Sequence, residues 1–313
     1  MNRKVTLLYI SLACVLSLQA QTRQQMGGVY YAYPEGPSAK TGTFGTATYV
    51  MSDSLSVPQG YAPFYISHYG RHGSRWMPKD DRYVWICKHF EDESNLTPLG
   101  LQVKGMLQRV WENARGNGGR LSKLGALQHQ GIAHRMFERY PQIFAAGNAV
   151  KARSSVVDRC AKSMQAFTSE LHTLQPGLNL DVKTDSADMA WIAYVSPEVK
   201  ALENRTHVQA QVSPRRFLLQ LFKDVSKVDE PLKLMTEMHT VASSIQDVGL
   251  NFSSYPQDIE DGLNALFTDD EFRAIYDANN LRMTINNGTV ATNEDIPARS
   301  AISLWQNIEA EAD

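Results

Sequence analysis

The segment from residue 61 to residue 75 constrains the fold of this chain most. Tyr61–Tyr69 is aromatic and β-branched, which predicts a buried β-strand. A polar, glycine-flanked stretch, Gly-Arg-His-Gly-Ser-Arg, follows at once at residues 70–75. In α/β proteins, functional residues lie in loops at the carboxyl ends of parallel strands. We therefore expect a central sheet with a functional loop at residues 68–76.

Helix and strand signals alternate downstream of this loop. Thr97 and Ser122 each open a helical pattern as N-cap residues. Residues 149–155 predict a short strand that leads into a helix from about 157 to 171, and residues 179–184 predict another strand. This alternation predicts an α/β fold with a central, mostly parallel sheet flanked by helices.

A helical segment follows the α/β pattern. Residues 190–290 carry helical patterns, for example at 214–225 and 230–248, with little strand signal. We expect an α-helical subdomain there, inserted into an α/β unit whose N-terminal part spans residues 21–189. Residues 291–313 predict the start of a helix that returns to the core. Its apolar face would hold Ile302, Trp305, Ile308 and Ala312.

The acidic end of this last helix is unfavourable, because acidic residues at a helix C-terminus oppose the helix dipole. We therefore expect the sequence to stop inside a helix, as a fragment would.

Residues 1–20 have the pattern of a secretory signal peptide. Two basic residues precede the apolar run Val5–Leu18, which is too short for a membrane-spanning helix, and Ala20 suits the cleavage site. A lipoprotein signal at Cys14 and a buried N-terminal strand or helix are less favoured alternatives. We expect an exported protein that is periplasmic, surface-bound or extracellular, with no membrane span after signal removal.

Composition excludes several classes of protein. The chain has 31 Lys+Arg, 33 Asp+Glu and 43% hydrophobic residues, which fits neither a disordered chain nor a nucleic-acid binder. Cys87 and Cys160 remain after signal removal, and the sequence leaves open whether they form a disulfide. No cofactor is expected. His68 and His72 are four residues apart, but on a strand and a loop they point differently, so we expect no metal site.

The residue types in the loop suit phosphate chemistry. Arg71 and Arg75 bracket His72, and a guanidinium group binds a phosphoryl group through two parallel hydrogen bonds. A neutral imidazole nitrogen between them can act as a nucleophile. Gly73 would let the backbone pass close to the imidazole, with a carbonyl oxygen orienting the other ring nitrogen. A surface basic loop with an incidental histidine stays an alternative on these residues alone.

Residues 65–75 resemble the Arg-His-Gly-x-Arg signature of the histidine phosphatase superfamily, in the branch of histidine acid phosphatases, phytases and multiple inositol polyphosphate phosphatases. The last of these is the most similar type. Further segments similar to the family occur in the family's order at residues 96–100, 124–141 and 153–167. Together they make the resemblance much more specific than the five-residue motif alone would.

The resemblance implies a role for each matching residue. His72 would be the nucleophile that forms a phosphohistidine, and Arg71 and Arg75 would bind the phosphoryl oxygens. Arg153, at the end of its own predicted strand, would be the third catalytic, substrate-binding arginine. Arg159 could compete for that role, but we expect it to form an ion pair with Asp158 or Glu170.

Two departures from the family's pattern stand out. Met77 occupies a position where the family usually has proline, which shapes the loop and does no chemistry. The family also has a late His-Asp or His-Ala-Glu motif that protonates the leaving alkoxide, and no histidine of this sequence is followed in that way. The expectation is that the sequence stops short of the general acid.

The resemblance and the signal together predict an exported phosphomonoesterase that acts through His72, with inositol polyphosphates such as phytate as favoured substrates. Residues 68–88 carry five basic and two acidic side chains, which suits a multiply charged small-molecule phosphoester. A broad-specificity acid phosphatase and a sugar-phosphate phosphatase are alternatives. So are a non-catalytic phosphate-binding protein without the acid, and an unrelated helical module with a chance motif.

Overall fold

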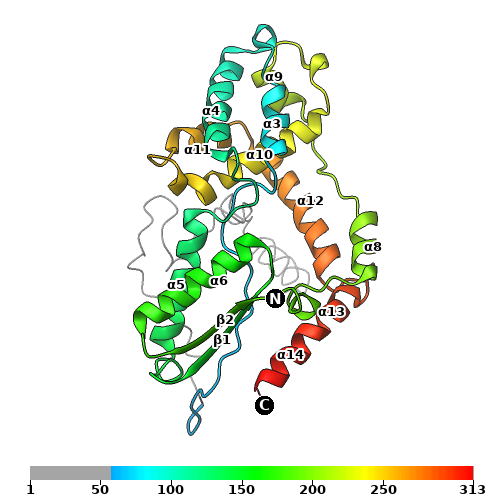
Figure 1. Cartoon of the computed structure of the whole chain (residues 1–313). Helices are drawn as coiled ribbons and strands as arrows, with labels where there is room; N and C mark the ends of the chain where they lie inside the picture. The colour runs from blue at the N-terminus through cyan, green and yellow to red at the C-terminus, as the bar shows by residue number, and fades with distance from the viewer. Residues whose placement is uncertain (1–57, 313) are drawn as a thin grey trace, which may run out of the picture.

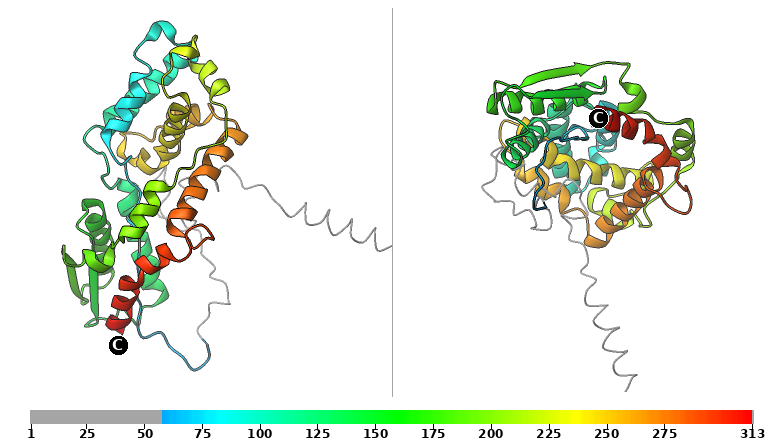
Figure 2. Two further views of the ribbon diagram at one scale, coloured as in Figure 1. Left: turned by 90° about the vertical axis from the view of Figure 1, so that its right-hand side faces the viewer. Right: turned by 90° about the horizontal axis from the view of Figure 1, so that it is seen from below.

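The computed structural model describes residues 58–312. The predicted signal peptide, residues 1–20, lies outside them. The molecule has a helical upper part and a lower part that contains a small parallel sheet (Figure 1). Figure 2 shows that the two parts follow one another along the long axis of the molecule. Within the described range, no helix has the length and apolarity needed to cross a bilayer.

The sheet consists of β1, Ala149–Ser154, and β2, Asn179–Thr184, which pair in parallel with Ala149 opposite Asn179. Helix α6, Asp158–Leu174, packs against both strands, and α5, Lys123–Arg139, packs against α6. The apolar residues between helices and strands include Ala133, Phe144, Leu171 and Leu178. The predicted α/β class, with a parallel sheet flanked by helices, is therefore confirmed, and within residues 58–312 the sheet has these two strands.

The prediction of a buried strand at Tyr61–Tyr69 is wrong. These residues form no regular element, and the exposed fractions of Tyr61 and Phe64 are 77% and 89%. A strand needs hydrogen-bonding neighbours for its N–H and C=O groups, and within residues 58–312 the strand pairing of the sheet is that of β1 with β2, without this segment. The end of the segment is nonetheless fixed, because His68 stacks on Phe167 of α6 and the Tyr69 hydroxyl donates to the Ile192 carbonyl.

The helical part is built from two stretches of chain. Its apolar core brings residues 76–114 together with residues 210–275 and includes Trp76, Phe217 and Met235. The predicted division at residue 189 assigns the first stretch to the α/β unit, whereas its side chains pack with the helical one. The α-helices formed by these two stretches and their continuation are α3 (Asp80–Lys88), α4 (Pro98–Ala114), α9 (Arg215–Leu221), α10 (Pro231–Val248), α11 (Gln257–Asn264) and α12 (Asp269–Asn287).

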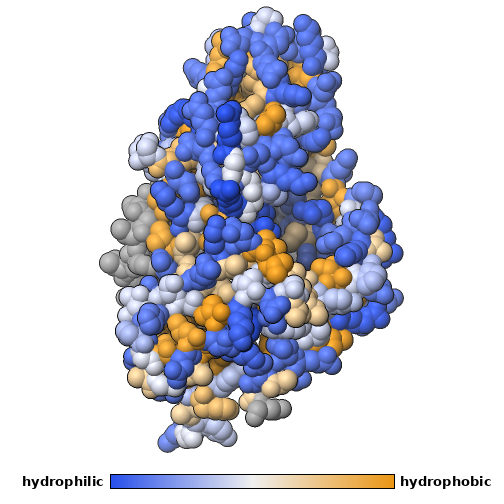
Figure 3. Space-filling model, viewed as in Figure 1, coloured by the Kyte–Doolittle hydropathy of each residue, from blue (hydrophilic) through white to orange (hydrophobic). Residues whose placement is uncertain are grey.

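The remaining elements of the described chain are α7 (Met189–Ile192), α8 (Pro197–Arg205), α13 (Ile296–Ser300), α14 (Ile302–Ala312) and the 3₁₀ turns η2 (Glu93–Asn95), η3 (Val225–Lys227) and η4 (Gly249–Asn251). The predicted last helix is split at Ala301. Two residues of its predicted apolar face, Ile302 and Trp305, are exposed, with exposed fractions of 49% and 61%. Figure 3 shows apolar patches over the lower part of the molecule, where the strands lie.

The predicted N-caps are confirmed. Thr97 Oγ1 accepts a hydrogen bond from the Gly100 N–H at the start of α4, and Ser122 Oγ accepts one from the Gly125 N–H at the start of α5. Both side chains also bind other segments, because the Thr97 hydroxyl donates to the Gln220 carbonyl and the Ser122 hydroxyl donates to the Ser74 carbonyl. The Ser122 N–H donates to the Ser74 carbonyl at 2.9 Å. The start of α5 is thereby joined to the loop that carries His72.

Candidate active site

His72 lies in a loop that links the two parts of the molecule. Its Nδ1 is 2.8 Å from the Gly73 carbonyl oxygen, so Nδ1 carries the proton and donates. This is the orienting carbonyl contact expected from the sequence. The other ring nitrogen, Nε2, then keeps its lone pair.

The pKa of His72 is lowered, first by burial and further by the positive charges of Arg159, Arg71 and Arg75, while the Gly73 hydrogen bond opposes the shift. His72 is therefore neutral at pH 7, the state that a nucleophile requires.

Hydrogen bonds fix the loop around His72 on two helices. The Gly73 N–H donates to Ser163 Oγ on α6 at 3.1 Å, and the Ser74 N–H donates to Gln128 Oε1 on α5 at 2.8 Å. His129 of α5 contacts the Arg71 carbonyl through Nε2 at 3.1 Å. The loop at His72 is thus held by backbone contacts on both sides of this residue.

Gly73 serves close packing against the backbone of α5. A side chain at Gly73 would place its Cβ 2.3 Å from the Gly125 carbonyl oxygen, and one at Gly125 would place its Cβ 2.2 Å from the Ser74 carbonyl oxygen. Real Cβ atoms do not approach backbone so closely. Glycine is therefore required at position 73 because the backbone there contacts the first turn of α5. The sequence analysis gives a different reason, namely close passage of the backbone by the imidazole.

Three arginines create the positive field at His72. Arg71, Arg75 and Arg159 are the charges that act on its imidazole. Arg75 donates to the Trp76 carbonyl at 2.7 Å. Burial and repulsion from Arg159 and Arg71 lower the pKa of Arg75. Guanidinium groups held together against their repulsion form a site that a phosphoryl group stabilises.

The structure does not bring Arg153 into this group. Its guanidinium donates to the Asp181 carbonyl at 2.7 Å and forms an ion pair with the Asp181 carboxylate. The Asp188 carboxylate lies 4.0 Å from Arg153 Nε on the other side. Arg153 is thus occupied by acidic partners along β2 and α7.

The expected ion pair of Arg159 with Asp158 or Glu170 is wrong. Asp158 pairs with Lys162 at 2.9 Å, and Glu170 contacts His134 Nδ1 at 3.1 Å. Within the described residues, the buried Nε of Arg159 has no hydrogen-bond partner. A signal did exist in the sequence: Arg153 lies inside the predicted strand, whereas Arg159 lies past its end, on the side where functional groups gather.

Asp247 is a functional candidate that sequence reasoning missed. It lies in the last turn of α10, and the Ser74 hydroxyl donates to its Oδ1 at 2.5 Å. Burial raises the pKa of Asp247 to about 6, although the Ser74 hydrogen bond and the charges of Arg75 and Arg71 oppose the shift. This carboxyl group therefore joins the helical part to the loop that carries His72, at a cost in stability whenever it is ionised.

We expect Asp247→Asn to stabilise the protein at pH 7.5 by about 2–3 kcal/mol. The folded pKa of Asp247 is about 6 and the ordinary value is 3.8, so wild-type stability falls as pH rises from about 4 to about 6 and is then flat. Asparagine keeps an acceptor for Ser74 and carries no charge. Urea unfolding of both proteins from pH 4 to pH 8 should show a gap that closes at low pH. A gap independent of pH would contradict the raised pKa.

His68 and the other histidines form no metal site in the described part of the chain. His68 is stacked on Phe167, and burial lowers its pKa. No group of three or more His, Cys, Asp or Glu side chains that could hold a metal ion occurs within residues 58–312. Cys87 and Cys160 are both free thiols.

Comparison with known proteins identifies solved structures of the same fold. No protein-family model and no curated protein matches this sequence. Crystal structures of a multiple inositol polyphosphate phosphatase from Bifidobacterium longum match it. The structure of its complex with inositol hexasulfate matches with a TM-score of 0.58 at 13% identity, and the match covers 89% of this chain and 73% of that one. The apo form gives a TM-score of 0.59 at 14% identity with the same coverage.

A phytase from D. castellii also matches, with a TM-score of 0.55 at 12% identity over 87% of this chain and 60% of that one. At such low identity these likenesses show a shared fold. The chain therefore has the fold of these phosphatases across most of its length.

Proposed function

We propose that this protein is a phosphomonoesterase of the histidine acid phosphatase and phytase type, with His72 as its nucleophile. The observation that carries the proposal is the geometry of His72, whose Nδ1 is engaged by the Gly73 carbonyl at 2.8 Å, together with the positive charges of three arginines that act on the imidazole. The fold shared with an inositol polyphosphate phosphatase and a phytase supports it. We propose Arg71, Arg75 and Arg159 as the phosphate ligands.

The proposed reaction has two steps. In the first, Nε2 of His72 attacks phosphorus, an N–P bond forms, and the P–O bond to the leaving oxygen breaks. The electron pair of that bond stays on the leaving oxygen, which takes a proton from solvent water. In the second, water attacks phosphorus, the N–P bond breaks, and inorganic phosphate leaves with His72 restored. Phosphoryl transfer requires mainly positioning and charge stabilisation, and the three guanidinium groups supply both.

Inositol polyphosphates, including phytate, are the substrates we favour. The neighbour from Bifidobacterium longum is a multiple inositol polyphosphate phosphatase in complex with inositol hexasulfate. A broad-specificity acid phosphatase is the main alternative. A non-catalytic phosphate-binding protein is a second alternative, because the sequence contains no His-Asp or His-Ala-Glu motif to protonate a leaving alkoxide. General acid catalysis is worth roughly 10²–10⁴-fold in rate.

Export remains part of the proposal. It rests on the basic start, the apolar run and the small residue at Ala20 within residues 1–20. An exported phosphatase would meet phosphoesters outside the cytoplasm, in the periplasm, at the cell surface or in the medium.

Phosphate release at acidic pH from p-nitrophenyl phosphate and from inositol hexakisphosphate tests the activity. The aryl ester has a good leaving group and needs only the nucleophile and the arginines, whereas the inositol ester also needs a proton donor. Release from the aryl ester is the expected result. Binding of inorganic phosphate without turnover of either ester would favour the non-catalytic alternative.

A further inference from the structure

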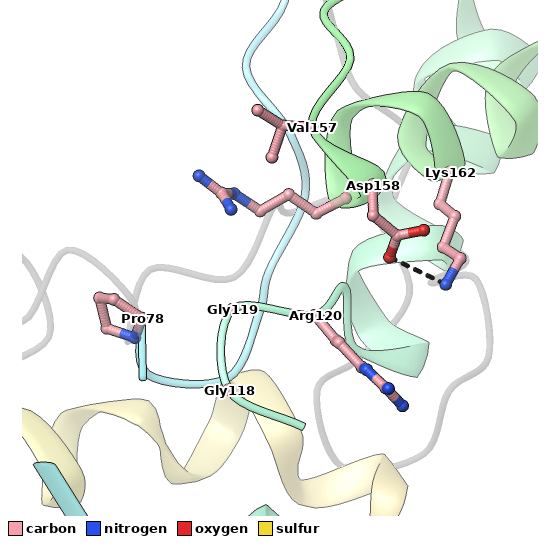
Figure 4. Close-up of a pocket in the computed structure, with 8 residues that line it drawn as sticks. Pro78, Gly118, Gly119, Arg120, Val157, Asp158 and Lys162 are labelled. Carbon is pink, nitrogen blue, oxygen red and sulfur yellow. Dashed lines mark ion pairs between the residues drawn. The ribbon is translucent and has the colours of Figure 1, made fainter. Parts of the chain in front are cut away.

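A cavity of about 560 Å³ lies beside the His72 loop. Figure 4 shows it between the turn at residues 118–120, Pro78 and the first turn of α6. Its lining consists of Pro78, Gly118, Gly119, Arg120, Val157, Asp158, Arg159 and Lys162. Arg159 also acts on His72, so this one side chain belongs to both the candidate active site and the cavity.

The backbone at residues 119–121, which carries Arg120 in the cavity lining, pairs with the backbone at residues 75–77, which follows His72. The Trp76 N–H donates to the Arg120 carbonyl at 3.2 Å, the Gly119 N–H donates to the Met77 carbonyl at 2.8 Å, and Arg75 forms an antiparallel bridge with Leu121. The position of Arg120 relative to Arg75 is therefore set by backbone pairing.

A second anchor holds the turn from the other side. The Asp80 carboxylate accepts hydrogen bonds from the Gly116 N–H at 2.6 Å and from the Gly118 N–H at 2.8 Å. Two glycines of this turn, Gly116 and Gly119, have φ angles of 77° and 73°, which side-chain-bearing residues rarely adopt. The turn is thus a preorganised structure, and ligand binding need not order it.

The charges that line the cavity favour an anion. Arg120, Arg159 and Lys162 are basic, and Asp158 is the single acidic residue of the lining. Asp158 and Lys162 form an ion pair at 2.9 Å, but their side chains are 62% and 52% exposed. Exposed ion pairs contribute little stability, so a phosphate group can take Lys162 from Asp158 at small cost.

We propose that this cavity binds a second phosphate group of the substrate, held by Arg120 and Lys162, while the first phosphate lies at His72. The inference rests on the proposed function and extends it to a specificity site. Arg120 presents a forked donor and Lys162 a point charge, and both suit a phosphate dianion. The substrate class is therefore an ester with two or more phosphates on one compact scaffold.

Calorimetric titration tests the second site without turnover. The probes are inositol hexasulfate, which presents several anionic groups on one ring and is not a phosphate ester, and inorganic sulfate, which presents one. We compare the full chain with Arg120→Gln, Lys162→Gln and the double variant. Arg115→Gln is the matched control, because Arg115 is an exposed arginine of the same turn that lies over Trp111 and does not line the cavity.

The expected result is a tenfold or larger weakening of hexasulfate binding in each single variant. The ratio of the sulfate Kd to the hexasulfate Kd should fall accordingly, and Arg115→Gln should leave that ratio unchanged. An unchanged ratio in the double variant, or an equal fall in the control, would overturn the second site. A failure of the proposed function would be seen in a different measurement. In that case the wild type and His72→Ala would turn over p-nitrophenyl phosphate equally.

Discussion

Replacement of His72 by alanine is expected to lower kcat for p-nitrophenyl phosphate by at least about 10⁴-fold, because the variant has no nucleophile to form the covalent intermediate. The Gly73 carbonyl contact at 2.8 Å and the lowered pKa of His72 both prepare Nε2 for attack. A neighbouring acid or general electrostatics cannot replace a bond-forming atom. The loss should therefore be the same at every pH at which the wild type is active.

His134→Gln is the control for this measurement. His134 lies on α5, where it contacts Glu138 and Glu170, and it is not among the groups that act on His72. We expect it to keep wild-type activity. Circular dichroism and thermal unfolding of His72→Ala should confirm that the fold persists. A folded His72→Ala protein that retains more than a few per cent of the activity would exclude His72 as the nucleophile.

Arg159→Gln is expected to produce the second large loss, about 10²–10⁴-fold in kcat/KM for the aryl ester, since the removed guanidinium would stabilise the transferring phosphoryl group. Together with Arg71 and Arg75, Arg159 is one of the positive charges that act on His72. Its buried Nε has no hydrogen-bond partner within residues 58–312. Arg159→Lys restores the charge without the fork, so we expect an intermediate activity.

Arg153→Gln is the matched comparison, because it removes the same kind of charge at the strand next to α6. Arg153 is engaged by Asp181 and Asp188, so its loss should act on stability and reduce activity by less than tenfold. Kinetics on both substrates and urea unfolding of both variants separate the two roles. The reverse order of activities would return Arg153 to the site and remove Arg159 from it.

Local sequence signals predicted the elements that depend on local interactions. Thr97 and Ser122 identified the starts of α4 and α5, because an N-cap side chain bonds to its own helix. The strands β1 and β2 were predicted at residues 149–155 and 179–184, since a strand–helix–strand unit is contiguous in sequence. The motif at residues 71–75 is likewise local, because its five residues are consecutive in the sequence.

Features that depend on distant partners were not predicted. Tyr61–Tyr69 has the composition of a strand, but strand formation needs a neighbouring strand, which the segment's own composition does not reveal. Asp247 is 173 residues from Ser74 along the chain, so only the packing of α10 brings them together. Arg153 lies in β1 and Arg159 in the first turn of α6, and the choice between them depends on Asp181 of the neighbouring strand.

The position of the loop explains how the two parts of the molecule contribute to one site. The residues of the nucleophile motif contact α5 and α6 of the lower part through Gly73 and Ser74, and the Ser74 hydroxyl contacts α10 of the helical part. Figure 1 shows these helices around the junction of the two parts. A substrate bound at His72 would therefore lie where both parts can contact it.

The most direct test of this account is to trap the covalent intermediate. The protein is mixed with p-nitrophenyl phosphate labelled with ³²P, quenched in alkaline detergent, digested and mapped by mass spectrometry, because phosphohistidine survives alkali and is lost in acid. The account predicts an acid-labile label on the peptide that contains His72, and none in His72→Ala. Phosphate release that continues without any label on His72, or a label at another residue, would contradict it.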